Sequence, residues 1–186
     1  MSRTSVTRLD KFDNSDFKPG SASKRILWTL ASGIFFQTWF PWSSRIKVMI
    51  LKAFGASIGK GLVLKPRVTI KYPWKLSIGN HVWIGEQVWI DNLAEVSIGN
   101  HVCISQGAML LCGNHNYKKQ TFDLMTGPIA LEDGVWIGAK SIVAPGITCH
   151  SHSVLSVGSI ATENLQAHGI YQGNTAILRK QRTMEG

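Results

Sequence analysis

The sequence predicts an all-β fold, a parallel β-helix of six-residue repeats with a short helical segment before it and one protruding loop. The main observation is the spacing of aliphatic residues in the stretch from Leu76 to Asn100. Neither an amphipathic helix nor an alternating strand has a period of six. A chain wound into triangular coils has this period, because one aliphatic residue per repeat points inward and stacks on the next coil. The residues that carry the period are Ile78, Ile84, Ile90 and Val96.

The repeat extends in both directions and is interrupted once. The tripeptide S-I-G recurs at Ser57, Ser77 and Ser97, which predicts coils of three repeats plus two extra corner residues. The six-residue step breaks at Gly113 and resumes at Leu131. We therefore expect a loop over residues 113–128 that leaves the coil. The expected organisation is an N-terminal arm and apolar, basic helical segment over 1–52, a β-helix over 53–178, and a basic tail over 179–186.

Length and composition fit one domain with a substantial core, at 186 residues and a net charge of +9. Seven of the nine excess positive charges lie within residues 1–60. The three cysteines have neither a paired nor a metal-ligand spacing, which argues against a disulfide framework and favours a reduced, cytoplasmic setting. They are Cys103, Cys112 and Cys149.

The segment Ile26–Trp42 is apolar and uncharged. It is shorter than the ~20 residues that span a bilayer, and Gly33, Gln37 and Pro41 interrupt it, so a simple spanning helix is not expected. Two alternatives remain. Helices here could cap the first coil, as solenoids require, or this part of the chain, residues 24–52, could make peripheral contact with a membrane. The aromatic residues for such contact are Trp28, Phe35, Phe36, Trp39, Phe40 and Trp42, and the basic ones are Lys24, Arg25, Arg45, Lys47 and Lys52. No motif supports nucleic-acid binding.

Several longer motifs resemble a known family. The run PIALEDGVWIGAKSIVAPGI, followed by SVGSIATENL and YQGNTAILRKQR, resembles the left-handed β-helix acyltransferases of the hexapeptide-repeat family. The segments FGASIGKG, YPW and ISQGAMLLCGNHNY are similar to O-acetyltransferases assigned to colanic acid and related exopolysaccharide synthesis. The resemblance covers roughly residues 45–182, with Thr175 standing where the family usually has Pro.

The resemblance implies a left-handed coil and a homotrimer with sites between subunits. It also implies O-acetylation of a saccharide hydroxyl by acetyl-CoA, the acceptor being an exopolysaccharide precursor that could be lipid-linked, at the inner face of the membrane. The alternative from a different class is a non-enzymatic β-helix scaffold or a membrane-recruited assembly module.

A histidine in the expected loop over residues 113–128 fits this chemistry. Acetyl transfer to a hydroxyl needs a base that removes the hydroxyl proton as attack occurs, and an imidazole suits that role at neutral pH. His115 is the only histidine of the loop, and it matches the position of the family's base. Asp123 could orient its ring. Cys112 as an acyl-accepting nucleophile is the weaker alternative, because the family transfers the acyl group directly.

The remaining site residues follow from the resemblance. The expected coenzyme A contacts are Trp136, Ala139, Val157, Thr162 and Lys180, and the expected acceptor contacts are Asp91, Asn92 and Asn114. Each could instead be an ordinary residue of the coil surface or tail. Zinc-dependent carbonic anhydrases of this fold need three histidines, two of them spaced H-x4-H, and no such pair occurs, so no metal is expected.

Overall fold

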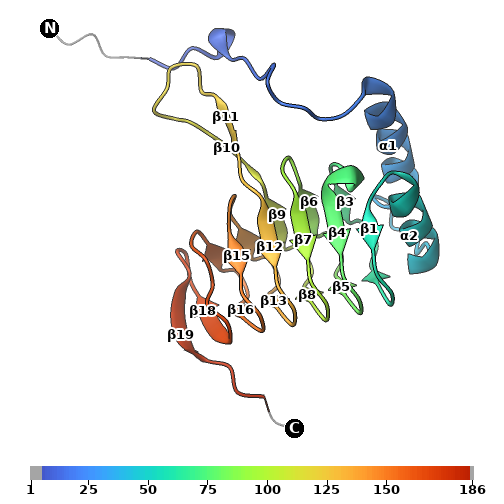
Figure 1. Ribbon diagram of the computed structural model, residues 1–186, viewed down its shortest axis with the longest axis vertical. Coiled ribbons are helices and arrows are strands. Elements are labelled where there is room, and N and C mark those ends of the chain that lie inside the picture. Colours follow the sequence, from blue (N-terminus) through green and yellow to red (C-terminus); the bar gives the residue numbers. More distant parts are fainter. Residues whose placement is uncertain (1–5, 185–186) are drawn as a thin grey trace, which may run out of the picture.

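The computed structural model describes residues 6–184 and shows a left-handed parallel β-helix closed at one end by two helices (Figure 1). Strands of successive coils pair in parallel, and each coil turns through three faces. The predicted fold class is confirmed. Residues 1–5 of the expected arm and residues 185–186 of the expected tail lie outside the described residues.

Each face is one sheet whose strands come from successive coils. The first face contains β1 (Ser57–Ile58), β4 (Leu76–Ile78), β7 (Val96–Ile98), β12 (Ile129–Leu131) and β15 (Thr148–Cys149). The second contains β2 (Val63–Leu64), β5 (Trp83–Ile84), β8 (Cys103–Ile104), β13 (Trp136–Ile137), β16 (Val154–Leu155), β18 (Gly169–Gln172) and β19 (Ile177–Gln181). The third contains β3 (Thr69–Ile70), β6 (Trp89–Asp91), β9 (Met109–Leu111), β14 (Ile142–Val143) and β17 (Ile160–Ala161).

The predicted aliphatic column runs through the centre of the coils. Ile58 pairs with Ile78, and Ile78 with Ile98, so the early coils repeat every 20 residues. Leu131 pairs with Cys149, so the later repeat shortens to 18 residues. No member of the column is more than 7% exposed, as the repeat predicts. These members are Ile58, Leu64, Ile70, Ile78, Ile84, Ile90, Ile98, Ile104, Leu110, Leu131, Ile137, Val143, Cys149, Leu155 and Ala161.

A second inward position lies two residues before the column residue of most strands. At β5, Ile84 and the preceding residue Val82 are buried, whereas Trp83 between them points outward and is 44% exposed. Successive side chains of a strand point to opposite sides, so both flanking residues face the interior. The sequence analysis did not assign this position. In the sequence, this position can be recognised by a small or branched apolar residue two places before the column residue. The buried residues at this position are Leu76, Val82, Val88, Val96, Val102, Ala108, Ile129 and Val135.

Histidines recur at one corner for conformational reasons. His81 and His101 have φ values of 56° and 55°, and their rings stack with centroids 5.2 Å apart. His152 and His168 have φ values of 61° and 60° and stack at 5.0 Å. Histidine tolerates this left-handed conformation better than most residues do. Their repetition is therefore a property of the coil.

Another corner is enlarged in three successive coils. The chain leaves the third face after β3, β6 and β9, and it reaches the first face only after extra residues. The first two detours are residues 71–75, which include a 3-10 helix at Pro73–Lys75, and residues 91–95. The third is the predicted loop, which projects away from the coils (Figure 1). We call this position the enlarged corner, and it carries the two extra residues predicted for each early coil.

The two helices cap the first coil. Helix α1 (Ala22–Phe35) begins at Ser21, whose hydroxyl accepts a hydrogen bond from the Lys24 amide, and α2 (Ser44–Ala53) is capped likewise by Ser43. Trp28 is buried and donates from Nε1 to the Ile70 carbonyl at 2.9 Å. The capping alternative is therefore confirmed.

Several residues expected at a membrane belong to this cap. Trp28 and Phe36 are buried in the core, and Lys47 has no exposed surface. The Lys47 ammonium donates to the carbonyls of Leu64 and Lys65, at 3.2 and 3.0 Å, and burial lowers its pKa. Membrane contact by these three side chains was a wrong expectation, because they stabilise the first coil instead.

The expected C-terminal tail is partly a strand. β19 begins at Ile177 and pairs antiparallel with β18, extending the second face (Figure 1). The boundary expected at residue 179 is therefore wrong, because the apolar pair Ile177 and Leu178 continues into the basic residues without a break.

We expect the column to dominate stability. Ile84→Ala should lower the free energy of unfolding by about 2–5 kcal/mol, because Ile84 is fully buried. His81→Asn should cost far less, since the side chain is exposed and asparagine tolerates a positive φ. Chemical denaturation of both variants checks this. Equal destabilisation would contradict the inward assignment of Ile84.

Candidate active site

The loop at the enlarged corner is a β-hairpin that presents His115. It consists of β10 (Gly113–His115) and β11 (Leu124–Thr126), which pair antiparallel with His115 opposite Leu124. Asn114 is exposed, and its Oδ1 accepts a hydrogen bond from the His115 amide at 2.8 Å. The hairpin thus holds the backbone of both predicted residues in a defined position.

The His115 ring is fixed by a backbone carbonyl and by aromatic packing. Its Nδ1 lies 2.9 Å from the carbonyl oxygen of Phe122. A carbonyl only accepts, so Nδ1 carries the proton and Nε2 of the neutral ring has a free lone pair. The ring also stacks on the ring of Phe122, with centroids 4.5 Å apart and an angle of 8°. This arrangement suits Nε2 to accept a proton.

Asp123 does not orient the imidazole, contrary to expectation. Its carboxylate accepts a hydrogen bond from the Lys119 ammonium at 2.7 Å, and this contact and one with Thr121 lower its pKa. The orienting group is the carbonyl of Phe122, which has a φ of 52° at the hairpin turn. A phenylalanine in this conformation is uncommon and costs free energy, so the surrounding contacts must hold it.

The N-terminal arm lies along the hairpin (Figure 1). The Arg8 amide donates to the Gln120 carbonyl at 2.7 Å, and the ring of Phe12 lies 5.8 Å from that of His115. Further along, Phe17 packs near Tyr72 at the enlarged corner, with centroids 6.3 Å apart. The sequence analysis missed these contacts, because the arm has no repeat or motif.

A cavity of about 620 Å³ lies between the arm, the enlarged corner and the hairpin. Leu124 lines the cavity, and His115 pairs with Leu124 in the hairpin but is not itself a lining residue. Its charged lining residues are Asp13, Asp16, Lys18, Lys75, Glu95 and Asp123. The cavity is therefore rich in both donors and acceptors of hydrogen bonds.

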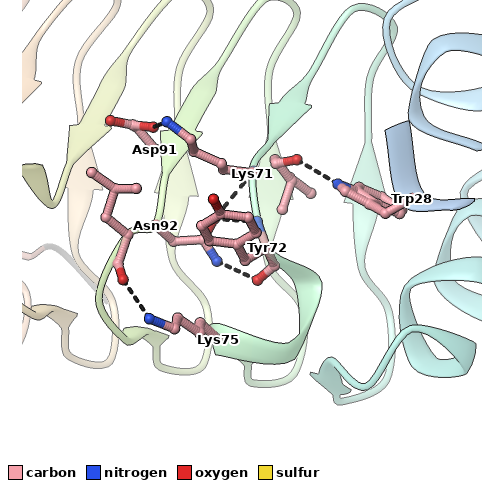
Figure 2. Close-up of polar contacts among 8 residues, drawn as sticks. Trp28, Lys71, Tyr72, Lys75, Asp91 and Asn92 are labelled. Atoms are coloured by element: carbon pink, nitrogen blue, oxygen red, sulfur yellow. Dashed lines mark hydrogen bonds and ion pairs between the residues drawn. The ribbon is translucent and has the colours of Figure 1, made fainter. Parts of the chain in front are cut away.

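The enlarged corner brings Asp91 close to Gly113 at the base of the hairpin. It gives Asn92 a structural role (Figure 2). The Asp91 carboxylate is mostly buried and pairs with the Lys71 ammonium at 3.0 Å. The Asn92 side chain is fully buried. Its Oδ1 accepts from the amides of Lys71 and Tyr72, and its Nδ2 donates to the Tyr72 carbonyl. Acceptor binding by Asn92 was a wrong expectation, because these bonds occupy its amide.

Cys112 lies at the base of the hairpin but is fully buried. Burial is the main cause that raises the pKa of its thiol to about 11. A protonated, inaccessible thiol is a poor nucleophile. The geometry therefore argues against the alternative of an acyl-cysteine.

Three of the expected coenzyme A residues line one groove on the second face. Trp136, Ala139 and Val157 surround a hollow of about 610 Å³. The Trp136 indole donates to the Ser105 hydroxyl at 3.0 Å, which fixes this exposed ring against the preceding coil. The Val157 side chain is 69% exposed, so the groove offers apolar surface along its length.

Basic residues lie at the C-terminal side of this groove. Arg182 lines it and donates to the carbonyls of Gly134 and His152, at 3.1 and 3.3 Å. Lys180 is exposed on β19 and pairs with Ile170 of β18. Ile170 lines the groove, so Lys180 lies at the rim of the groove. Arg182 was not selected from the sequence, where it looked like part of a solvated tail. Thr162 is exposed after β17 and does not line the groove.

No group of three histidine, cysteine, aspartate or glutamate side chains within residues 6–184 is arranged to hold a metal ion. Over the same residues, no helix combines the length and hydrophobicity needed to cross a membrane.

Comparisons with known proteins show which proteins this chain resembles. No protein-family model matches the chain. The sequence is 35% identical over 170 residues to WcaF of Escherichia coli K12, assigned to acetyl transfer in colanic acid biosynthesis, covering 89% of this chain and 91% of WcaF. The fold resembles that of acetyltransferase VCA0836 of Vibrio cholerae, solved with acetyl coenzyme A, with a TM-score of 0.79, 20% identity and coverages of 89% and 92%. It also resembles galactoside acetyltransferase solved with coenzyme A, with a TM-score of 0.76, 20% identity and coverages of 86% and 80%.

The coil architecture, shared with these solved structures, is that of a left-handed β-helix. The 35% identity with WcaF extends over most of both chains, which shows the family. The chain belongs to the hexapeptide-repeat acetyltransferase family, which confirms the resemblance drawn from its motifs. The protein is therefore an enzyme, and the non-enzymatic scaffold is set aside.

We expect Cys112 and Cys149 to resist thiol reagents in the folded protein. Both are fully buried, and burial raises the pKa values of their thiols to about 11 and about 12. At pH 8 the thiolate fraction of Cys112 is then about one in a thousand. A Cys103→Ser variant leaves only these two thiols, and DTNB should label neither until urea unfolds the protein. Rapid labelling of the folded variant would reopen the nucleophile alternative.

Proposed function

We propose that this enzyme transfers the acetyl group of acetyl-CoA to a hydroxyl group of a saccharide, with His115 as general base. The observation that carries the proposal is the hydrogen bond from His115 Nδ1 to the Phe122 carbonyl, which leaves Nε2 free to accept a proton. The relationship to WcaF supports an acceptor from exopolysaccharide synthesis, either soluble or lipid-linked.

The chemistry requires one proton to move twice. Acetyl-CoA supplies the acetyl group as a thioester. His115 Nε2 removes the acceptor hydroxyl proton as the oxygen bonds to the acetyl carbon, and it returns a proton to the departing sulfur. The Phe122 carbonyl stabilises the protonated ring in between, because Nδ1–H donates to it throughout. Direct transfer needs no cysteine, which agrees with the buried position of Cys112.

We assign the acceptor to the cavity beneath the arm. Sugars present many hydroxyl groups, each both a donor and an acceptor, and the cavity offers carboxylates such as Asp16 and ammonium groups such as Lys75. Its volume lies within the range of small-molecule sites. The exposed Asn114 amide beside His115 is a further candidate contact. Asp91, ion-paired near the base of the hairpin, is a candidate for contact from the coil side.

We assign coenzyme A to the groove of Trp136, Ala139 and Val157 on the second face. These apolar surfaces fit a pantetheine chain, and Arg182 and Lys180 provide positive charge for phosphates at its C-terminal side. The hairpin leaves the coil from a different corner, after the third face. A homotrimer would bring the hairpin of one subunit to the groove of the next, so we propose that the enzyme works as a trimer.

His115→Ala should lower kcat by roughly 10²–10⁴-fold, the usual cost of losing a general base. The assay measures thiol release from acetyl-CoA with a panel of sugars. His101→Asn is the matched control, because His101 is an exposed corner residue, and it should keep full turnover. Asp123→Asn should not reproduce this loss of kcat, since Asp123 pairs with Lys119 and not with the imidazole. Any change should appear in the KM for the sugar, because Asp123 lines the proposed acceptor cavity. Unchanged turnover in a folded His115→Ala enzyme would rule out the assignment.

Lys180→Glu should raise the KM for acetyl-CoA by up to about tenfold, because it replaces attraction to phosphates with repulsion at an exposed rim. The KM for the sugar should stay unchanged, since the acceptor binds elsewhere. Lys60→Glu reverses an exposed charge far along the coil and serves as the control. An equal rise in both KM values, or no rise, would contradict the role of Lys180 and leave Arg179, Arg182 or neither as the phosphate contact.

A further inference from the structure

Helix α1 is apolar on two opposite sides, and the described part of the chain covers only one of them. Trp28, Ser32 and Phe36 follow one another at a four-residue spacing and are buried against the first coil. A second stripe on the opposite side is between 57% and 62% exposed. It consists of Ile26, Leu27, Leu30 and Ile34. A helix that is apolar all round is normally covered all round. The capping role explains the first stripe and leaves the second unexplained.

The turn after α1 extends this exposed surface. Trp39 and Phe40 are 64% and 58% exposed. The turn is fastened to the helix, because Trp42 packs against Phe35 at 4.8 Å and donates to the Ile34 carbonyl at 3.0 Å. Two exposed aromatic rings are therefore held in place beside the aliphatic stripe. We call these six side chains, Ile26, Leu27, Leu30, Ile34, Trp39 and Phe40, the apolar patch.

Positive charge borders the apolar patch, and the stretch of chain that contains the patch carries no acidic residue. Residues 17–85 contain eleven lysines and arginines and no aspartate or glutamate. The Arg67 guanidinium lies over the Trp39 ring at 4.6 Å, and Arg25 lines a shallow hollow together with Ile26 and Leu30. An exposed apolar surface edged by cations matches the boundary of an anionic bilayer, where rings enter the headgroup region and cations meet lipid phosphates.

We propose that the apolar patch docks the enzyme on the surface of an anionic membrane. Leu30, Ile34, Trp39 and Phe40 enter the headgroup region, and Arg25 and Arg67 contact acidic headgroups. A second copy of this chain fits the patch less well, because two such ends meeting face to face would bring like charges together. The proposal concerns where the enzyme lies and is independent of the acetyl acceptor.

Cosedimentation of the full-length protein with vesicles tests the proposal. Binding to vesicles of phosphatidylglycerol and phosphatidylcholine should exceed binding to phosphatidylcholine alone, and should weaken without vanishing as salt is raised to 0.5 M. Removing one positive charge should weaken binding about fivefold. The Arg25→Glu/Arg67→Glu variant reverses two charges and should therefore lose more than about fivefold for each position. Leu30→Gln/Ile34→Gln should lose about tenfold or more, because apolar area no longer enters the lipid.

Matched variants elsewhere on the surface serve as controls. Ile177→Gln removes an exposed aliphatic side chain at the other end of the β-helix, and Lys140→Glu reverses an exposed charge there. Both should bind vesicles as the unmodified protein does, and thermal unfolding should show all variants folded. Trp39→Ser/Phe40→Ser tests the turn if the helix variant does not fold.

Three results would overturn the proposal. The first is an absence of binding to anionic vesicles at low salt. The second is an equal loss of binding in the patch and control variants. The third is a change of molecular mass by light scattering in Leu30→Gln/Ile34→Gln with vesicle binding intact, which would make the apolar patch an interface between copies.

Discussion

Stacking of inward-facing aliphatic side chains from coil to coil is the interaction on which the rest of this structure depends. Each strand of the three faces is only two to five residues long, so no coil could hold its shape alone. Ile84 pairs in register with Leu64 on one side and Ile104 on the other, which fixes the rise of the chain at each turn. Backbone pairing then follows, because a slip by one residue would turn the column outward.

This constraint acts on the faces and leaves the corners free to vary. The chain can lengthen at a corner as long as it returns in phase, and it does so at one corner in three successive coils. Asn92 shows how such a detour is held, because its buried amide binds the backbone of Lys71 and Tyr72 in the preceding coil. The hairpin that presents His115 therefore rises from a rigid support, which is what the proposed general base would need.

The parts of the fold that repeat could be predicted from the sequence, and the parts that do not repeat could not. The column was predictable because Ile78, Ile84 and Ile90 recur every six residues. The hairpin was predictable as a loop because this six-residue step stops at Gly113 and resumes at Leu131. The burial of Asn92 depends on a chain segment twenty residues earlier, which no local pattern reveals. The group that orients His115 is a backbone carbonyl, and a carbonyl has no residue identity to read.

The arm shows how a segment without any motif can still determine the geometry of the site. The hairpin pairs over only three residues on each strand, and an isolated two-stranded hairpin is marginally stable. The rings of Phe122 and Phe12 both pack against His115 and supply packing that the hairpin lacks. The Arg8 amide adds a backbone hydrogen bond to the hairpin turn. The position of the proposed base therefore depends on residues more than a hundred positions earlier, and the arm belongs to the candidate active site.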